Sequence, residues 1–214
     1  RARAARLTPA GPNPVERFVE RLEPVLLATA PSGFYPWFGS VMGGGWLAAG
    51  PGYRRVFADT GHVNVFGAWS LRNYRTLDAA VSLPTFLDGR GRVSAHAKYL
   101  FADKVSFYGL GRDSSKDDRT SFTYEPTTAG ARVDFEVVPH LVLGGGLAYE
   151  RVETAGGERA PSVEQVFTPS SAPGLGEDVS YLVTRASAAI DWRESPAYTT
   201  SGGLYRIEYR RYDA

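Results

Sequence analysis

Residues 92–110 read RVSAHAKYLFADKVSFYGL, and almost every second residue of this stretch is apolar. One face collects Val93, Ala95, Ala97, Tyr99, Phe101, Val105, Phe107 and Gly109. The other face collects mainly Arg92, Ser94, His96, Lys98, Lys104, Ser106 and Tyr108. A period of two kept over so long a run predicts one very long β-strand. Strands of globular proteins usually have about 5–6 residues. A membrane-spanning strand needs about 9–11 tilted residues, with one face in lipid and the other towards a polar lumen. The stretch therefore predicts an outer-membrane β-barrel.

The composition agrees with a β-rich chain. The 214 residues include 24 glycines and 12 tyrosines, which suit tight turns and aromatic side chains at a membrane interface. No run of about 18 apolar residues occurs, which excludes a transmembrane helix in this sequence. The absence of cysteine excludes disulfides and thiolate metal sites. The net charge of +1 gives no overall field that would favour nucleic acid, and we expect neither a nucleic-acid partner nor a cofactor.

Residues 1–32 are expected to form an N-terminal extension with one amphipathic helix at 13–27. Asn13 can cap this helix, Pro14 suits its first position, and Glu16 completes a capping box. The helix could lie in the membrane interface, serve as a periplasmic linker or plug the lumen. The opening RARAARL lacks the apolar core of a signal peptide, so a mature or trimmed N-terminus is expected.

Residues 33–214 are expected to form the barrel. The predicted strands are 34–41, 45–57, 62–72, 75–83, 92–110, 120–138, 141–153, 180–192 and 203–212. Short turns are predicted at 58–61, 88–91, 138–140 and 193–197, and longer connections at 111–118 and 154–178. A shift in the apolar register of the sixth strand predicts a bulge near Pro126. Because complete bacterial barrels have even strand numbers, about nine strands indicate the first part of a larger barrel.

Four stretches in a fixed order resemble a known family. GFYPWFGSVMGGGWLAAGPGYRR (33–55) leads to GAWSLRNYRTLDAAVSLP (67–84), and KVSFYGLGRDSSKDDRTSFTYEPTTAGARVDFEV (104–137) precedes HLVLGGGLAYERVE (140–153). This order resembles the barrel of the BamA/TamA-like outer-membrane assembly family, also called the bacterial surface antigen family. The most specific piece is Phe-Tyr-Gly-Leu-Gly at 107–111, followed by a polar run and Arg-Thr-Ser-Phe.

The resemblance implies a barrel of about sixteen strands in the outer membrane of a Gram-negative bacterium. It also implies a non-enzymatic role in inserting or translocating outer-membrane proteins through a lateral seam. The implied partners are outer-membrane lipids, client proteins and periplasmic factors. The segment 34–41 would be the seam strand, with Tyr35, Pro36 and Phe38 as its candidate residues. The family's periplasmic repeats and its Val-Arg-Gly-Phe/Tyr loop do not occur in this sequence, absences that fit truncation.

The polar face of the predicted strands supplies candidate lumen residues of mixed charge. These are Arg72, Asp78, His96, Lys98, Arg132, Asp134, Glu136, Arg206 and Glu208. Mixed signs favour a lumen lined with cross-strand ion pairs, because a selectivity filter needs a ring of one sign. Five aromatic residues are candidates for the membrane girdles, namely Trp46, Trp69, Tyr149, Trp192 and Tyr205.

Other interpretations remain open from the sequence. The chain could be a passive pore or a ligand-gated channel, or a soluble β-protein with a hydrophobic ligand cavity. Ser94 and His96 share one face and could serve a lipid hydrolase, although no acidic residue stands beside them. The histidines His62, His96 and His140 favour polar lumen or interface positions over a metal site. The glycine triplets at 43–45 and 144–146 favour close packing over phosphate binding, because no helix pattern follows either.

Overall fold

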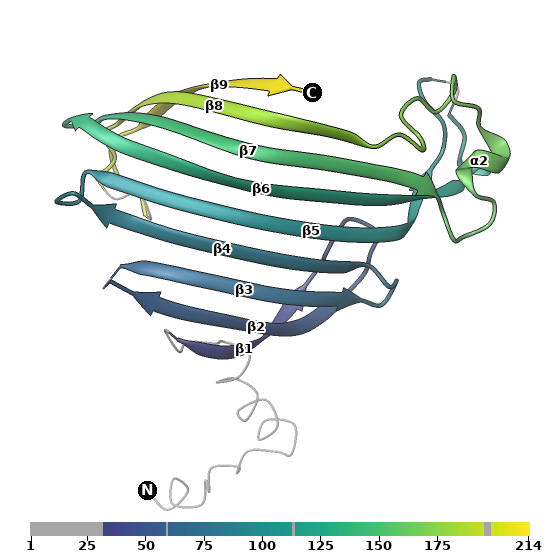
Figure 1. Cartoon of the computed structure of the whole chain (residues 1–214), viewed down its shortest axis with the longest axis horizontal. Coiled ribbons are helices and arrows are strands. Elements are labelled where there is room, and N and C mark those ends of the chain that lie inside the picture. The colour runs from purple at the N-terminus through teal and green to yellow at the C-terminus, as the bar shows by residue number, and fades with distance from the viewer. Residues whose placement is uncertain (1–31, 59, 113, 195–197) are drawn as a thin grey trace, which may run out of the picture.

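The computed structural model describes residues 32–58, 60–112, 114–194 and 198–214 (Figure 1). The amphipathic helix predicted at 13–27 lies outside these residues. Within them, no helix is long and apolar enough to cross a membrane.

Nine strands pair with their chain neighbours, all antiparallel, in one sheet with the order β1 to β9 (Figure 1). The strands are β1 (Gly33–Gly39), β2 (Ala48–Phe57), β3 (Gly61–Ser70), β4 (Arg75–Phe86), β5 (Gly91–Phe107), β6 (Thr120–Val138), β7 (Leu141–Gly156), β8 (Val179–Asp191) and β9 (Leu204–Asp213). The predicted all-β antiparallel sheet is confirmed. β5, β6 and β7 have 17, 19 and 16 residues, well above the usual length of about 5–6. Among the described residues no ladder joins β1 to β9, so each has one unpaired edge.

The connections divide between the two ends of the sheet. At one end, here called the loop end, lie residues 40–47, 71–74, 108–119 and 157–178. The last of these holds the single-turn helix α2 (Val163–Val166), at the right of Figure 1. The opposite turn end has tight turns such as Leu87–Arg90, where Leu87, Asp88 and Gly89 adopt positive φ.

The register gives the sheet two distinct faces, because directly opposed residues of antiparallel strands point to the same side. One opposed row runs Val65, Ala79, Ala97, Ala129, Tyr149 and Leu182. This outer face leaves large apolar side chains exposed, among them Leu77 (55%), Leu147 (56%) and Ile207 (74%). The alternate rows form the inner face, which carries the polar side chains of β4 to β9.

The sheet curls towards its inner face. Three strand spacings of about 4.8 Å separate β6 from β9, so they would stand about 14 Å apart in a flat sheet. Nevertheless Arg132 of β6 and Glu208 of β9 form an ion pair at 3.1 Å. The inner face is therefore concave and the apolar outer face convex.

A small apolar core covers the inner face at the loop end. The connection between β1 and β2 folds back over the sheet, behind the middle strands in Figure 1, and places Val41 and Met42 in one core with residues of β3, β5 and β6. The core consists of Val41, Ala48, Ala68, Tyr74, Leu100 and Ala102, with Trp37, Met42, Phe66, Val105 and Tyr124 packed against it. The rings of Trp37 and Phe66 stack with their centroids 4.7 Å apart.

The predicted bulge near Pro126 is wrong. β6 pairs with β7 without interruption from Phe122 to Glu136, and the irregularity lies in β5, between Ala102 and Val105. The extra residue there reverses the alternation of β5, so Val105 and Phe107 lie on the inner side and not with Val93 as predicted. The apolar core explains this change, because Val105 and Tyr124 pack into it.

Two connections also differ from their predictions. The turn predicted at 193–197 is longer, because β8 ends at Asp191 and β9 begins at Leu204. Backbone hydrogen bonds from Trp192 to Gly203 and from Glu194 to Ser201 extend the hairpin beyond both strands. The segment predicted as a surface loop at 154–178 is folded onto the sheet: β7 continues to Gly156, and Val163 is 1% exposed.

Candidate functional site

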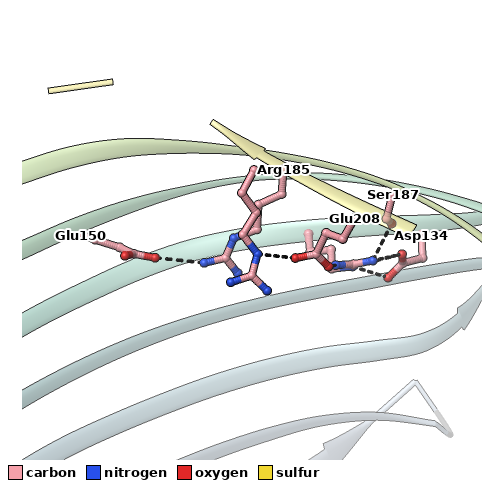
Figure 2. Close-up of polar contacts among 7 residues, drawn as sticks. Asp134, Glu150, Arg185, Ser187 and Glu208 are labelled. Atoms are coloured by element: carbon pink, nitrogen blue, oxygen red, sulfur yellow. Dashed lines mark hydrogen bonds and ion pairs between the residues drawn. The ribbon is translucent and has the colours of Figure 1, made fainter. Parts of the chain in front are cut away.

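A network of ion pairs crosses the inner face from β6 to β9 (Figure 2). Arg132 donates to both carboxylate oxygens of Asp134 at 2.8–3.0 Å, to Ser187 Oγ at 2.8 Å and to Glu208 at 3.1 Å. Glu208 also accepts a hydrogen bond from Arg210 at 2.5 Å. The Arg132, Asp134 and Glu208 side chains are 22%, 17% and 20% exposed, so the network is partly shielded from water.

A separate ion pair on the inner face adds one cation and one anion to those of the network. Arg185 of β8 donates to Glu150 of β7 at 3.0 Å (Figure 2). The buried Nε of Arg185 has no hydrogen-bond partner among the described residues. Arg132, Arg185 and Arg210 therefore face Asp134, Glu150 and Glu208, three cations against three anions. Such a balanced surface lacks the single sign that an ion-selective ring requires.

Gly144 makes this network possible. A Cβ at this position would overlap Asp134 Oδ1 and lie 2.6 Å from Ser187 Oγ and 3.0 Å from Arg132 Nη2. Gly145 points to the outer face and has its nearest neighbour, Arg185 O, at 3.9 Å. The glycine triplet of β7 thus makes room for an ion pair that lies over the strand, which agrees with the close-packing interpretation.

The sequence candidates for the lumen occupy different surroundings. Eight of them lie on inner-face rows of the register: Asp78, His96, Lys98, Arg132, Asp134, Glu136, Arg206 and Glu208. Ion pairs join Arg132 to Asp134 and to Glu208, and Asp78 stands directly opposite Lys98, without an ion pair between them among the described residues. Arg72 lies in the turn between β3 and β4, outside the ladders. Ser187, Glu150 and Arg185 were missed, although their alternation in β7 and β8 places them on the same face.

The free edge of β1 lacks one backbone hydrogen-bond donor. Pro36 stands opposite Pro51, and the β2–β3 ladder skips Gly50 and Pro51 before it resumes at Gly52. The skipped pairs indicate that the nitrogen of Pro51 faces β3, since proline has no N–H to donate. In an antiparallel pair, the backbone N–H and C=O groups of two directly opposed residues point either both towards the partner strand or both away from it. Because the backbone groups of Pro51 point away from β1, those of Pro36 point away from β2. Pro36 therefore faces the free edge of β1 and leaves a gap in its row of donors.

The other seam candidates flank this gap. Tyr35 lies on the inner face, where its hydroxyl donates to Asn64 Oδ1 at 2.6 Å and Arg54 lies 5.2 Å from its ring centroid. Phe38 lies on the outer face with Pro36 and is 53% exposed.

Four of the five girdle candidates lie at the two ends of the sheet. Trp69 lies on the outer face at the loop end and Trp46 is exposed in the connection between β1 and β2, whereas Tyr149 lies on the outer face in the middle of β7. Trp192 and Tyr205 lie at the turn end, where their ring centroids are 5.5 Å apart. Tyr99 was missed and lies on the outer face, donating to Glu125 Oε1 at 2.5 Å.

The hydrolase and metal candidates are not assembled into sites within the described residues. No hydrogen bond joins Ser94 to His96, and no group of three His, Cys, Asp or Glu side chains could hold a metal ion there. His140 has its Nδ1 3.0 Å from the backbone oxygen of Asp191, which ties the turn between β6 and β7 to the end of β8. Comparisons with family models, with curated proteins and with solved structures gave no match to this chain.

Proposed function

We propose that this chain forms a wall of an outer-membrane β-barrel of the BamA/TamA-like type and assists the insertion or translocation of outer-membrane proteins. The observation that carries the membrane part of the proposal is the two-faced sheet. Its outer face carries exposed apolar side chains on all nine strands and aromatic side chains near both ends, and eight of the nine strands have at least ten residues, enough to cross a bilayer. A sheet face of this size is unfavourable in water unless another surface covers it.

The proposed mechanism uses the β1 edge. β1 has seven residues, the fewest of any described strand, and Pro36 removes one donor from its free side. A strand that pairs with this edge therefore forms a weaker ladder than it would elsewhere. Opening of that ladder would expose a template on which an incoming client strand can pair, as extended peptides do at other sheet edges. The assembly activity itself rests on the family resemblance.

The test is an insertion assay with vesicles of bacterial outer-membrane lipids. The chain is reconstituted, a urea-unfolded test barrel is added, and its folding is followed by the shift in gel mobility. We expect faster insertion than into protein-free vesicles and than into vesicles that carry an unrelated barrel. Insertion at the spontaneous rate, with the chain embedded, would refute the assembly role, and steady single-channel conductance would then favour the passive pore.

A further inference from the structure

Arg75 projects from the outer face near the loop end without an acidic partner. Its guanidinium lies over two rings, 4.7 Å from the centroid of Trp69 and 4.9 Å from that of Phe101. None of the ion pairs among the described residues includes Arg75. Stacking on aromatic faces leaves the N–H edge of a guanidinium free to donate, in the fork that suits a phosphate.

The platform beneath Arg75 is held in place. Trp69 donates from Nε1 to Asn73 Oδ1 at 2.8 Å, which fixes the indole in the turn between β3 and β4. Glu125 on β6 is engaged by the Tyr99 hydroxyl. The two rings therefore orient the guanidinium of Arg75, and no carboxylate among the described residues neutralises its charge.

Two apolar hollows continue from Arg75 along the outer face. The first has a volume of about 340 Å³ and is lined by Arg75 and Trp69 together with small or apolar residues that include Ala49, Gly67 and Leu77. The second has about 390 Å³ and is lined by the next outward residues along the same strands, including Val65, Ala79 and Ala97. The rows that line them are adjacent, Leu77 and Tyr99 in the first hollow and Ala79 and Ala97 in the second, so the two hollows, here called the track, follow one another from the level of Arg75 towards the middle of the strands.

We propose that this track binds one lipid with an anionic phosphate headgroup, with the phosphate on Arg75 and an acyl chain in the two hollows. The proposal rests on the proposed function in one respect, because it requires the outer face to lie in a bilayer. The charge of the unpaired Arg75 and the apolar lining match the two parts of such a lipid. Trp69 and Tyr99 stand at the level where aromatic residues meet headgroups.

Native mass spectrometry of the chain in detergent, with phosphatidylglycerol and phosphatidylcholine of equal chain length, tests the site. We expect preferential retention of phosphatidylglycerol, and Arg75→Gln should reduce this preference about fivefold, the effect of one cation near a membrane surface. Arg55→Gln is the matched control, since Arg55 is also exposed on the outer face but at the turn end. Gly67→Leu should displace the lipid by filling the first hollow, because a Cβ there has no neighbour closer than 3.8 Å.

Equal retention by the wild type, Arg75→Gln and Gly67→Leu would overturn the proposal, as would an equal loss in Arg55→Gln. Displacement of the lipid by inorganic phosphate alone would also overturn it, because the acyl track would then contribute nothing. A chain that folds into vesicles but shows no preference for phosphatidylglycerol fails only this inference. A chain that does not enter vesicles fails the proposed function as well.

Discussion

Arg132 Nη1 on β6 lies 3.1 Å from Glu208 Oε2 on β9, although β7 and β8 run between them. The same guanidinium holds Asp134 and Ser187, so one side chain ties three strands together across the concave face. The contact depends on the curl of the sheet, and the curl in turn keeps the polar side chains inside and the apolar ones outside.

Arg132→Ala should destabilise the sheet by about 1–3 kcal/mol, because it removes charge-assisted hydrogen bonds, leaves the partly buried Asp134 carboxylate without its partner and leaves Glu208 with Arg210 alone. The measurement is the urea midpoint of unfolding in detergent micelles, followed by tryptophan fluorescence. Arg206→Ala is the control, since Arg206 is exposed on the inner face of β9 and forms none of the described ion pairs. Equal midpoints for both variants would show that the network contributes nothing to stability.

Gly144→Ala should destabilise the protein by about 1–3 kcal/mol, the usual cost of forcing an extra group into a filled space. The added Cβ would displace Asp134 from Arg132. Gly145→Ala is the adjacent control: its Cβ would meet only Arg185 O at 3.9 Å, so the midpoint should stay the same or rise slightly. A Gly144→Ala variant as stable as Gly145→Ala would contradict the account of the triplet.

Pro36→Val should slow the insertion of client proteins in the vesicle assay. The substitution restores an N–H to the free edge of β1, so a strand already paired with that edge is held more strongly and opens less readily for a client strand. Pro51→Val is the control, since the nitrogen of Pro51 faces β3 inside the sheet. The account expects a lower rate for the first variant and an unchanged rate for the second. Equal rates in both variants and the wild type would remove Pro36 from the mechanism.

The connection between β8 and β9 should respond to pH through Glu194. The Thr200 and Ser201 hydroxyls donate to this carboxylate at 2.7 and 3.1 Å and hold the pKa of Glu194 below its usual value. A lowered pKa favours the folded connection above the unfolded pKa, and this contribution is lost as the pH falls through the folded pKa. Thr200→Val should raise the pKa of Glu194, and Ser201→Ala should raise it less, as measured by NMR titration of the carboxyl carbon. An unchanged pKa in Thr200→Val would show that the hydrogen bond has no effect.

The strands could be predicted from the sequence because each keeps a period of two that is independent of its neighbours. The prediction failed where packing across strands decides the structure. Phe122 and Tyr124 suggested a slip in β6, but the alternation is broken in β5, where the only local sign is Asp103, a carboxylate at a position that the alternation assigns to the apolar face.

For the candidate site, the sequence could predict which face of the sheet each residue lies on, but not which residues contact one another. Alternation placed Arg132, Asp134 and Glu208 on the polar side, but the curl of the sheet decides which of the polar residues meet. Arg75 shows the opposite case: alternation puts this charge on the apolar face, and only its position over Trp69 and Phe101 gives it a role.

The most direct test of the central claim is to measure which face of β5 lies in lipid. The chain contains no cysteine, so single-cysteine variants from Val93 to Tyr99 can each carry one nitroxide label in vesicles. We predict that labels at 93, 95, 97 and 99 are accessible to oxygen dissolved in lipid, and that labels at 94, 96 and 98 are accessible to a water-soluble nickel complex. Equal access of the nickel complex to both sets would contradict the assignment of the outer face to the membrane.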